Sequence, residues 1–339
     1  MPLFDSAAML KLYRKAAFSF PIEPILRVDR AAAQGQLVEP IVINALHFQS
    51  LIATKAARFR IAAPEALLVD FGLRRAHGTD AGLLAARAVW IAGFDGTATV
   101  MAEPAFGVPI YGTMAHSYIQ AFGDEYAAFE HFARVHPGNT VLLIDTYDTA
   151  AAAGKVVDLA HALEAEDINI NAVRIDSGDL GAAAVEVRRI LDQGGYEAIS
   201  IFVSGGLDEF EVERLIRDGA PIDGYGIGTQ LDCSADRPYL DCAYKLQEYA
   251  GQARRKRSEG KATWPGRKQL VREYDESGRF SHDTLALIDE KCSGDSLLQP
   301  VMKHGKRLRQ AENAATIRER AAAQLGCLPD NTQNAERKR

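Results

Sequence analysis

The chain lacks several features that would place it in other classes of protein. Only four of its 339 residues are cysteines, and they stand far apart, without the close pairs of a zinc site: Cys233, Cys242, Cys292 and Cys327. Isolated cysteines favour free thiols in a reducing compartment over a disulfide framework. No apolar run approaches the length of a membrane span, and residues 1–5 lack a charged leader followed by an apolar core. We therefore expect a cytoplasmic protein with no membrane span and no secretion signal.

An excess of positive charge is also missing. The sequence has 39 Lys and Arg against 45 Asp and Glu, a net charge of -6, which argues against non-specific binding of nucleic acid. The rest of the composition, 47% hydrophobic and 25% charged, is ordinary for a soluble globular protein. Its length is enough for one large α/β barrel or for two smaller domains.

Strand-like and helix-like segments alternate after Pro64. The pattern predicts strands at 66–71, 97–102, 141–145, 172–175, 199–203 and 224–227. It predicts helices between them at 80–92, 117–135, 150–165, 180–191 and 208–217. Right-handed βαβ crossovers would curl such a series into a parallel barrel or a doubly wound sheet. A full barrel has eight strands and six are readable, so we expect either an irregular α/β barrel or a barrel whose remaining strands the sequence pattern does not reveal.

The two ends of the chain give weaker patterns. We expect a helix over 7–19, an extended segment over 19–26, a helical stretch over 31–62 broken near Pro40, and a final helix over 311–325. The predicted organisation is a helical N-terminal part at 1–62, the barrel at 63–235, a basic loop and C-terminal return at 236–328, and a disordered tail at 329–339. The basic run over 254–268 is either a solvated surface or a lid or partner-facing arm that screens an oligophosphate.

Polar, charged or glycine-rich residues follow five of the predicted strands. They are residues 72–75, 146–148, 176–179, 204–206 and 226–229. A packed core does not require such strand ends, whereas a ligand site assembled from several strands does. The glycines would let backbone N–H groups approach a phosphate.

Arg174 and Asp176 belong to one of these strand ends. They are two residues apart on a predicted strand, so their side chains point to the same face. A guanidinium beside a carboxylate suits a phosphorylated sugar, because the first binds phosphate oxygens and the second binds hydroxyls or stabilises positive charge on the ring. A purely structural ion pair at a helix start is the alternative.

His116 has surroundings unlike those of the other histidines. It follows Gly112-Thr113-Met114-Ala115, and these small residues before a predicted helix leave room for a ligand. The start of a helix also favours an incoming anion. The alternative is a histidine that only caps its helix.

Six segments together resemble the nicotinate phosphoribosyltransferases, in the order of that family: 71–78, 93–97, 111–117, 145–148, 174–179 and 265–268. The resemblance extends from about Glu23 to about Pro329. It implies the irregular α/β barrel of the type II phosphoribosyltransferases, beside an α/β sandwich domain built from both chain ends.

The resemblance also implies a reaction. Nicotinate and 5-phosphoribosyl 1-diphosphate would give nicotinate mononucleotide and diphosphate for NAD salvage, with Mg²⁺ and with ATP hydrolysis coupled through a phosphohistidine, in a homodimer. His116 would carry the phosphoryl group, and Arg174 and Asp176 would complete the catalytic set. The base would contact Phe71, Arg74, Thr113 and Arg174. The phosphoribosyl diphosphate would contact Asp176, Ser204, Gly205, Gly206, Gly228 and Thr229.

Two departures from the family pattern affect these expectations. Family members begin earlier, with a segment that builds much of the sandwich and sends an aromatic residue into the partner's base site, and residues 1–22 match it poorly. Ala98 stands where the nicotinamide-using relatives have an acidic residue that accepts from the amide, which favours nicotinate. A truncated, non-catalytic phosphate-binding relative and a nicotinamide phosphoribosyltransferase remain alternatives, separated by turnover of the purified chain and by substrate competition.

Overall fold

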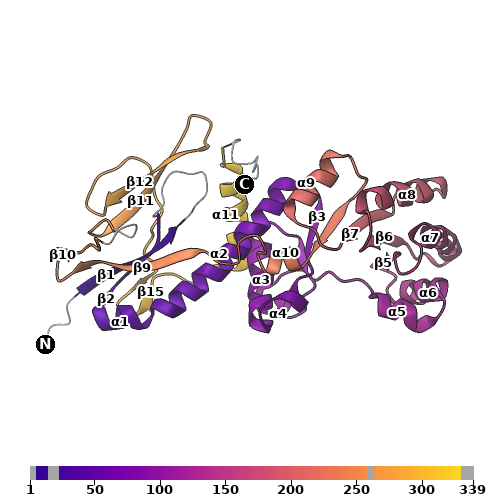
Figure 1. Ribbon diagram of the computed structural model, residues 1–339, viewed down its shortest axis with the longest axis horizontal. Coiled ribbons are helices and arrows are strands. Elements are labelled where there is room, and N and C mark those ends of the chain that lie inside the picture. Colours follow the sequence, from indigo (N-terminus) through magenta and orange to yellow (C-terminus); the bar gives the residue numbers. More distant parts are fainter. Residues whose placement is uncertain (1–4, 14–22, 258–262, 330–339) are drawn as a thin grey trace. The chain divides into compact units, whose positions relative to one another are not determined.

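A computed structural model describes residues 5–13, 23–257 and 263–329 (Figure 1). The chain forms two compact units, one from residues up to Leu51 and from Arg237 onward, and one from Ile52 to Asp236. We predicted boundaries after residues 62 and 235, whereas the first division lies inside a long helix, α2 (Glu39–Ala62). The predicted tail beyond Pro329 lies outside the described residues.

The Ile52–Asp236 unit is built on a six-stranded parallel sheet. Its order is β4 (Gly96–Thr97), β3 (Leu67–Asp70), β8 (Gly224–Ile227), β7 (Ser200–Ser204), β6 (Ile170–Ile175) and β5 (Thr140–Leu143). Every pairing in it is parallel, and β8 pairs with both β3 and β7. The sheet curls into half a barrel, which confirms the predicted irregular α/β barrel. The expected strand over 97–102 is wrong after Thr97, because the chain turns there into α4 (Ala102–Phe106).

The helices predicted between these strands are present, one of them divided in two, and short helices that the pattern did not predict accompany them. They are η1 (Leu73–Arg75), α3 (Thr79–Ile91), α5 (His116–Phe122), α6 (Glu125–Val135), α7 (Thr149–Leu163), η2 (Glu164–Glu166), α8 (Leu180–Gln193), α9 (Glu209–Arg217) and α10 (Thr229–Asp232). The single helix expected over 117–135 is two helices, because Gly123 ends α5 at φ 72° and Asp124 caps α6. Asp148, Asp179 and Asp208 cap the next helices in the same way.

The other unit is largely antiparallel β-structure, which the sequence pattern did not predict. One sheet has the order β10 (Gln252–Ala253), β9 (Asp241–Tyr249), β1 (Asp5–Tyr13), β2 (Glu23–Ala31). A second has the order β12 (Phe280–Leu287), β11 (Lys268–Tyr274), β13 (Asp295–Ser296), and β14 (Met302–Lys303) pairs with β15 (Lys306–Arg307). Among its described residues, three helices belong wholly or partly to this unit: α1 (Ala32–Leu37), α2 and α11 (Ala314–Gly326).

The helix predicted from residue 7 is wrong as far as residue 13. That segment is β1, which pairs with β2 on one side and β9 on the other, so pairing with distant strands overrides the local pattern. Residues 14–19 lie outside the described part of the chain. The extended segment is confirmed from Glu23 onward, and the break near Pro40 is confirmed because α1 ends at Leu37 and α2 begins at Glu39.

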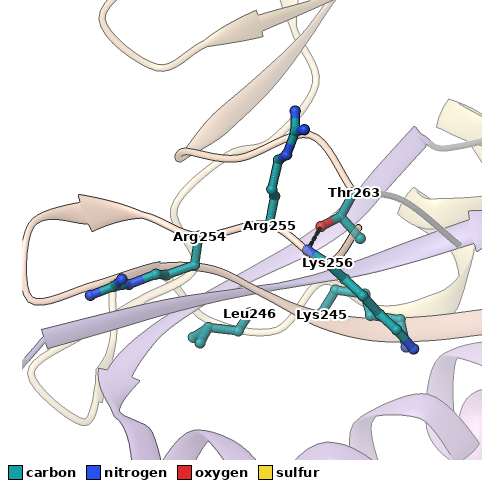
Figure 2. A pocket seen from close by; sticks show the side chains of 6 residues that line it. All are labelled: Lys245, Leu246, Arg254, Arg255, Lys256 and Thr263. Carbon is teal, nitrogen blue, oxygen red and sulfur yellow. Dashed lines mark hydrogen bonds between the residues drawn. The ribbon is translucent and has the colours of Figure 1, made fainter. Parts of the chain in front are cut away.

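The described residues of the basic run, 254–257 and 263–267, form neither helix nor strand, as predicted for a loop. Its described part surrounds a cavity of about 300 Å³ that is lined by Lys245, Leu246, Arg254, Arg255, Lys256 and Thr263 (Figure 2). The backbone N–H of Lys256 donates to the Thr263 hydroxyl at 3.0 Å, which joins the two sides of the loop. Four cationic side chains around one cavity make it a candidate site for an anion.

All four cysteines are free thiols. Among the described helices, none combines the length and apolar character needed to cross a bilayer.

A buried charge network joins α2 to α9 in the barrel unit. Lys55 is only 3% exposed, and its Nζ lies 2.7 Å from both Glu209 Oε2 and Asp236 Oδ1. Arg58 Nη1 contacts Asp236 Oδ2 at 2.8 Å, and Arg58 also pairs with Glu209. Burial raises the pKa of Asp236, but hydrogen bonds from Lys55 and Arg58 outweigh it and lower that pKa to about 2.

Replacing Asp236 should destabilise this unit in a pH-dependent way. The folded pKa of about 2 lies below the ordinary value of 3.8, so the carboxylate stabilises the fold above about pH 4 and loses this effect as the pH falls through 2. We expect Asp236→Asn to lower the free energy of unfolding by about 1 kcal/mol at neutral pH, because the carboxylate is partly exposed. Urea unfolding measures this. Glu186→Gln, at an exposed pair with Arg189, is the control and should have almost no effect. Equal effects of the two variants would contradict the assignment.

Candidate active site

The predicted site residues lie at one edge of the parallel sheet. Because β3, β8, β7, β6 and β5 are parallel, their carboxyl ends lie together. Phe71 and Gly228 directly follow β3 and β8, Ser204 ends β7, and Arg174 lies near the end of β6. The strand-end pattern of the sequence therefore predicted this position correctly.

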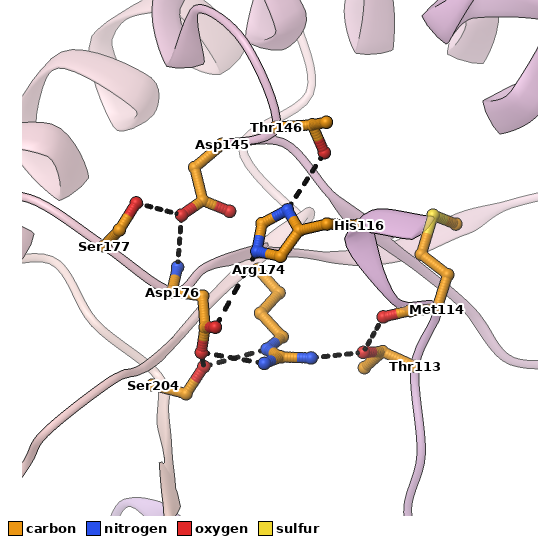
Figure 3. A network of polar contacts seen from close by, with 9 residues as sticks. All are labelled: Thr113, Met114, His116, Asp145, Thr146, Arg174, Asp176, Ser177 and Ser204. Carbon is orange, nitrogen blue, oxygen red and sulfur yellow. Dashed lines mark hydrogen bonds and ion pairs between the residues drawn. The ribbon is translucent and has the colours of Figure 1, made fainter. Parts of the chain in front are cut away.

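The Arg174 guanidinium is the centre of a polar cluster (Figure 3). Its Nε donates to Ser204 Oγ, its Nη1 to Thr113 Oγ1 and its Nη2 to Asp176 Oδ1, each at 2.8 Å. Its central carbon lies 5.2 Å from the centre of the Phe71 ring. Three acceptors from three segments fix the plane of the guanidinium, and the aromatic ring lies beside it.

Asp176 is an ionised carboxylate in this cluster. One of its oxygens accepts from both Arg174 and the Ser204 hydroxyl, and the other lies 3.8 Å from His116 Nε2. Burial raises the pKa of Asp176, but the Ser204 hydrogen bond, Arg174 and His116 together lower it below its usual value. The site therefore has a fixed negative charge next to a fixed positive charge.

His116 is the first residue of α5 and does not cap it. The residue before that helix, Ala115, makes no side-chain cap, and the imidazole Nδ1 instead contacts Thr146 Oγ1 at 3.1 Å. The side chain is 40% exposed, so a ligand can reach it. Our alternative interpretation of a helix-capping histidine is wrong, because both ring nitrogens point to side chains of other segments.

Asp145 and Thr146 are parts of the cluster to which our sequence reasoning gave no role. Asp145 Oδ2 accepts from the backbone N–H of Asp176 at 2.9 Å and from the Ser177 hydroxyl at 2.6 Å. Its Oδ1 is buried and accepts no hydrogen bond from the described residues. Asp145 follows β5 after one residue, and Thr146 begins one of the polar strand ends, so their position close to the end of the strand was the available signal.

The glycines of the site are present where chain segments approach closely. Gly205 has φ +105°, and a Cβ on it would lie 2.1 Å from the carbonyl oxygen of Asp176. A Cβ on Gly226 would lie 2.7 Å from the Phe71 ring, and Gly228 lies beside the Phe71 carbonyl. Arg74 is different: it is exposed on η1 and takes no part in the hydrogen-bonded cluster around Arg174.

Alanine at Gly205 should damage the site more than alanine at Gly206. Both glycines have positive φ, so either substitution costs about 1 kcal/mol in backbone strain. A Cβ on Gly205 would lie 2.1 Å from the Asp176 carbonyl oxygen, whereas no atom lies within 4 Å of a Cβ on Gly206. We expect Gly205→Ala to cost about 1–3 kcal/mol more in the free energy of unfolding. Thermal or urea unfolding measures the difference, and equal losses would contradict the close approach.

Comparison with known proteins identifies the family. The model of the Nicotinate phosphoribosyltransferase (NAPRTase) family matches residues 66–269. A nicotinate phosphoribosyltransferase of Mycobacterium tuberculosis is 46% identical over 318 residues, which cover 94% of this chain and 68% of that protein. The Bacillus subtilis nicotinate phosphoribosyltransferase is 38% identical, with 83% of this chain and 58% of that protein covered.

The fold agrees with the sequence comparison. The crystal structure of human nicotinic acid phosphoribosyltransferase superposes with a TM-score of 0.80 at 26% identity, covering 97% of this chain and 78% of that chain. The motifs, the curled parallel sheet and the cluster at its carboxyl edge all lie within the matched region. The chain belongs to the nicotinate phosphoribosyltransferase family.

Proposed function

We propose that this chain transfers a phosphoribosyl group from 5-phosphoribosyl 1-diphosphate to nicotinate, producing nicotinate mononucleotide and diphosphate for NAD salvage. The observation that carries the proposal is the fixed Arg174–Asp176 pair beside the Phe71 ring, in a member of this family. An aromatic face, a cation and an ionised carboxylate are the three groups that this reaction needs at one place.

The base would bind beside Phe71 and Arg174, which lie against each other. A pyridine ring stacks on the aromatic face, and the guanidinium pairs with the nicotinate carboxylate or a neighbouring phosphate. Thr113, held by Arg174, adds a hydroxyl at the same position. Arg74, exposed on η1, would supply a further cation when the base is bound. Ala98 offers no acceptor for an amide, which favours nicotinate over nicotinamide.

Asp176 would stabilise the ribose in the transition state. Departure of diphosphate leaves positive charge on the sugar ring, and an oriented carboxylate in a partly buried site lowers the energy of that charge. The Ser204, Gly205 and Gly206 turn and the Gly228–Thr229 turn lie at neighbouring strand ends. Their backbone N–H groups would bind the phosphates.

Mg²⁺ fits this site only as an ion shared with the substrate. The described residues contain no group of three His, Cys, Asp or Glu side chains that could hold a metal by themselves. Mg²⁺ in such enzymes is held by one or two carboxylates together with substrate phosphates, and the free Oδ1 of Asp145 is a suitable ligand. When bound, Mg²⁺ would neutralise negative charge on the leaving diphosphate.

His116 would accept a phosphoryl group from ATP. Its imidazole is accessible, and Thr146 and Asp176 orient it. Phosphorylation would add negative charge and acceptor oxygens beside the substrate. The basic cavity of the other unit would bind an oligophosphate. This agrees with the predicted lid or partner-facing arm in the basic run, rather than with a solvated surface. We also propose a cytoplasmic homodimer, as the family resemblance implies.

ATP should stimulate the reaction through His116. With nicotinate, phosphoribosyl diphosphate and Mg²⁺, we expect the purified chain to form nicotinate mononucleotide faster when ATP is present. His116→Ala should lose the stimulation, because no other residue of the cluster offers an imidazole. Chromatography of the product measures this, with nicotinamide as a competing base. A folded protein that binds phosphoribosyl diphosphate and forms no product would be a non-catalytic relative, contrary to the proposal.

Arg174 and Asp176 should be essential to turnover and not to folding. We expect Arg174→Ala to lower kcat/KM by at least about 100-fold, because nicotinate and the Asp176 carboxylate would both lose their cationic partner. Asp176→Asn should keep the fold, since an amide fills the same volume, and should lose activity with the charge. Arg189→Ala, at an exposed pair on α8, is the control. A normal rate in Arg174→Ala would refute the proposed role.

A further inference from the structure

Two buried carboxyl groups lie next to the site and take no part in the Arg174 cluster. Asp70 is the last residue of β3 and is 0% exposed, and Asp232 is the last residue of α10 and is 2% exposed. Both carboxyl groups lie at Gly72: Asp70 Oδ1 accepts from its backbone N–H, and a Cβ added there would be 2.2 Å from the Asp232 carboxyl carbon. Two carboxyl groups that are buried against the same residue do not both ionise away from water, so the pair retains a proton, which Asp232 and Asp70 share.

The surrounding donors decide which residue holds that proton. Burial raises the pKa of Asp70, but its Oδ1 accepts from the Gly72 backbone N–H and its Oδ2 from the Thr97 hydroxyl, both at 2.7 Å, and these donors oppose the rise by stabilising the ionised form. No backbone or side-chain donor among the described residues points at either oxygen of Asp232. Asp232 is therefore the protonated member, and its O–H donates to Asp70.

This hydrogen bond connects the two turns that carry proposed substrate contacts. Asp232 ends the helix that begins at Gly228 and Thr229. Its carboxyl group lies directly against Gly72, where an added Cβ would be 2.2 Å from the carboxyl carbon. Gly72 in turn lies between Phe71 and the η1 turn with Arg74.

We propose that Asp232 is a positioning residue which, through one proton shared with Asp70, sets the aromatic wall of the base site against the phosphate-binding turn. The proposal rests on the proposed function, because it assigns Phe71 to the base and Gly228–Thr229 to phosphate. Asp232 touches no substrate; it acts through Gly72 and through α10.

The proton gives the arrangement a pH limit. Burial, then the charge of Asp70 and the hydrogen bond to it, raise the pKa of Asp232 to about 9. Above that pH two negative charges would face each other and push the turns apart. The other titratable groups near the pair are Cys233, whose thiol donates to the Arg75 carbonyl at 3.2 Å and whose pKa is raised by burial, and the Arg75 guanidinium.

Asp232→Asn and Asp232→Ala form a matched pair of tests on the full chain. Asparagine keeps a donor toward Asp70, so it should retain the dissociation constants of nicotinate and phosphoribosyl diphosphate within about twofold. It should also remove the loss of affinity near pH 9, because an amide does not titrate. Alanine leaves Asp70 without its donor and should weaken both ligands about tenfold or more. Glu209→Ala, which removes a buried carboxyl away from the site, controls for general loss of stability.

Infrared spectroscopy detects the shared proton directly and does not require the chain to be catalytically active. The wild-type chain should show the band of a protonated carboxyl group at neutral pH, and Asp232→Asn should lack it. The same band in both proteins, or equal losses of affinity in the asparagine and alanine variants, would overturn the proposal. If the wild-type chain makes no product, the proposed function fails, while the band and the two dissociation constants still decide whether the pair holds a proton.

Discussion

The candidate site depends on the fixed orientation of one guanidinium. Arg174 donates three hydrogen bonds, each to a different segment of the chain. These hydrogen bonds determine where Thr113, Asp176 and Ser204 lie relative to one another. The parallel sheet makes this possible, because it places the ends of β6 and β7 side by side and brings the loop that contains Thr113 within reach. Without the charge of Asp176, the guanidinium would be a partly buried cation with only neutral acceptors.

Much of the barrel unit could be predicted from sequence, because the residues that determine each strand and helix lie within or next to that element. Each strand is a short apolar run followed by polar residues, and each following helix is amphipathic, so period and turn residues locate both. Asp148 and Asp179 illustrate why the site motifs are also structural: their side chains cap α7 and α8 immediately after the strand ends. The residues that follow Asp145 and Arg174 therefore both line the site and start the next helix.

The other unit could not be predicted in this way, because its strands depend on partners far away in the chain. β1 pairs with β9, more than two hundred residues later, and this pairing overrides the helical pattern of the segment. The Asp70–Asp232 pair was missed for a similar reason. Nothing near either residue in the sequence indicates that β3 and β8 are neighbours, and this neighbourhood brings the two carboxyl groups together.

The order of strands has a consequence for the growing chain. β8 is the last strand of the sheet to be synthesised, yet it lies between β3 and β7 and joins the earliest strands to the rest. A nascent chain that ends before Gly224 can form only two separate pieces, β4 with β3 and β7 with β6 and β5. Each piece exposes an unpaired edge of apolar strand, which is prone to pair with other chains. This half-barrel therefore becomes a single sheet only once β8 is free to pair, and β8 is followed directly by the turn that carries Gly228 and Thr229.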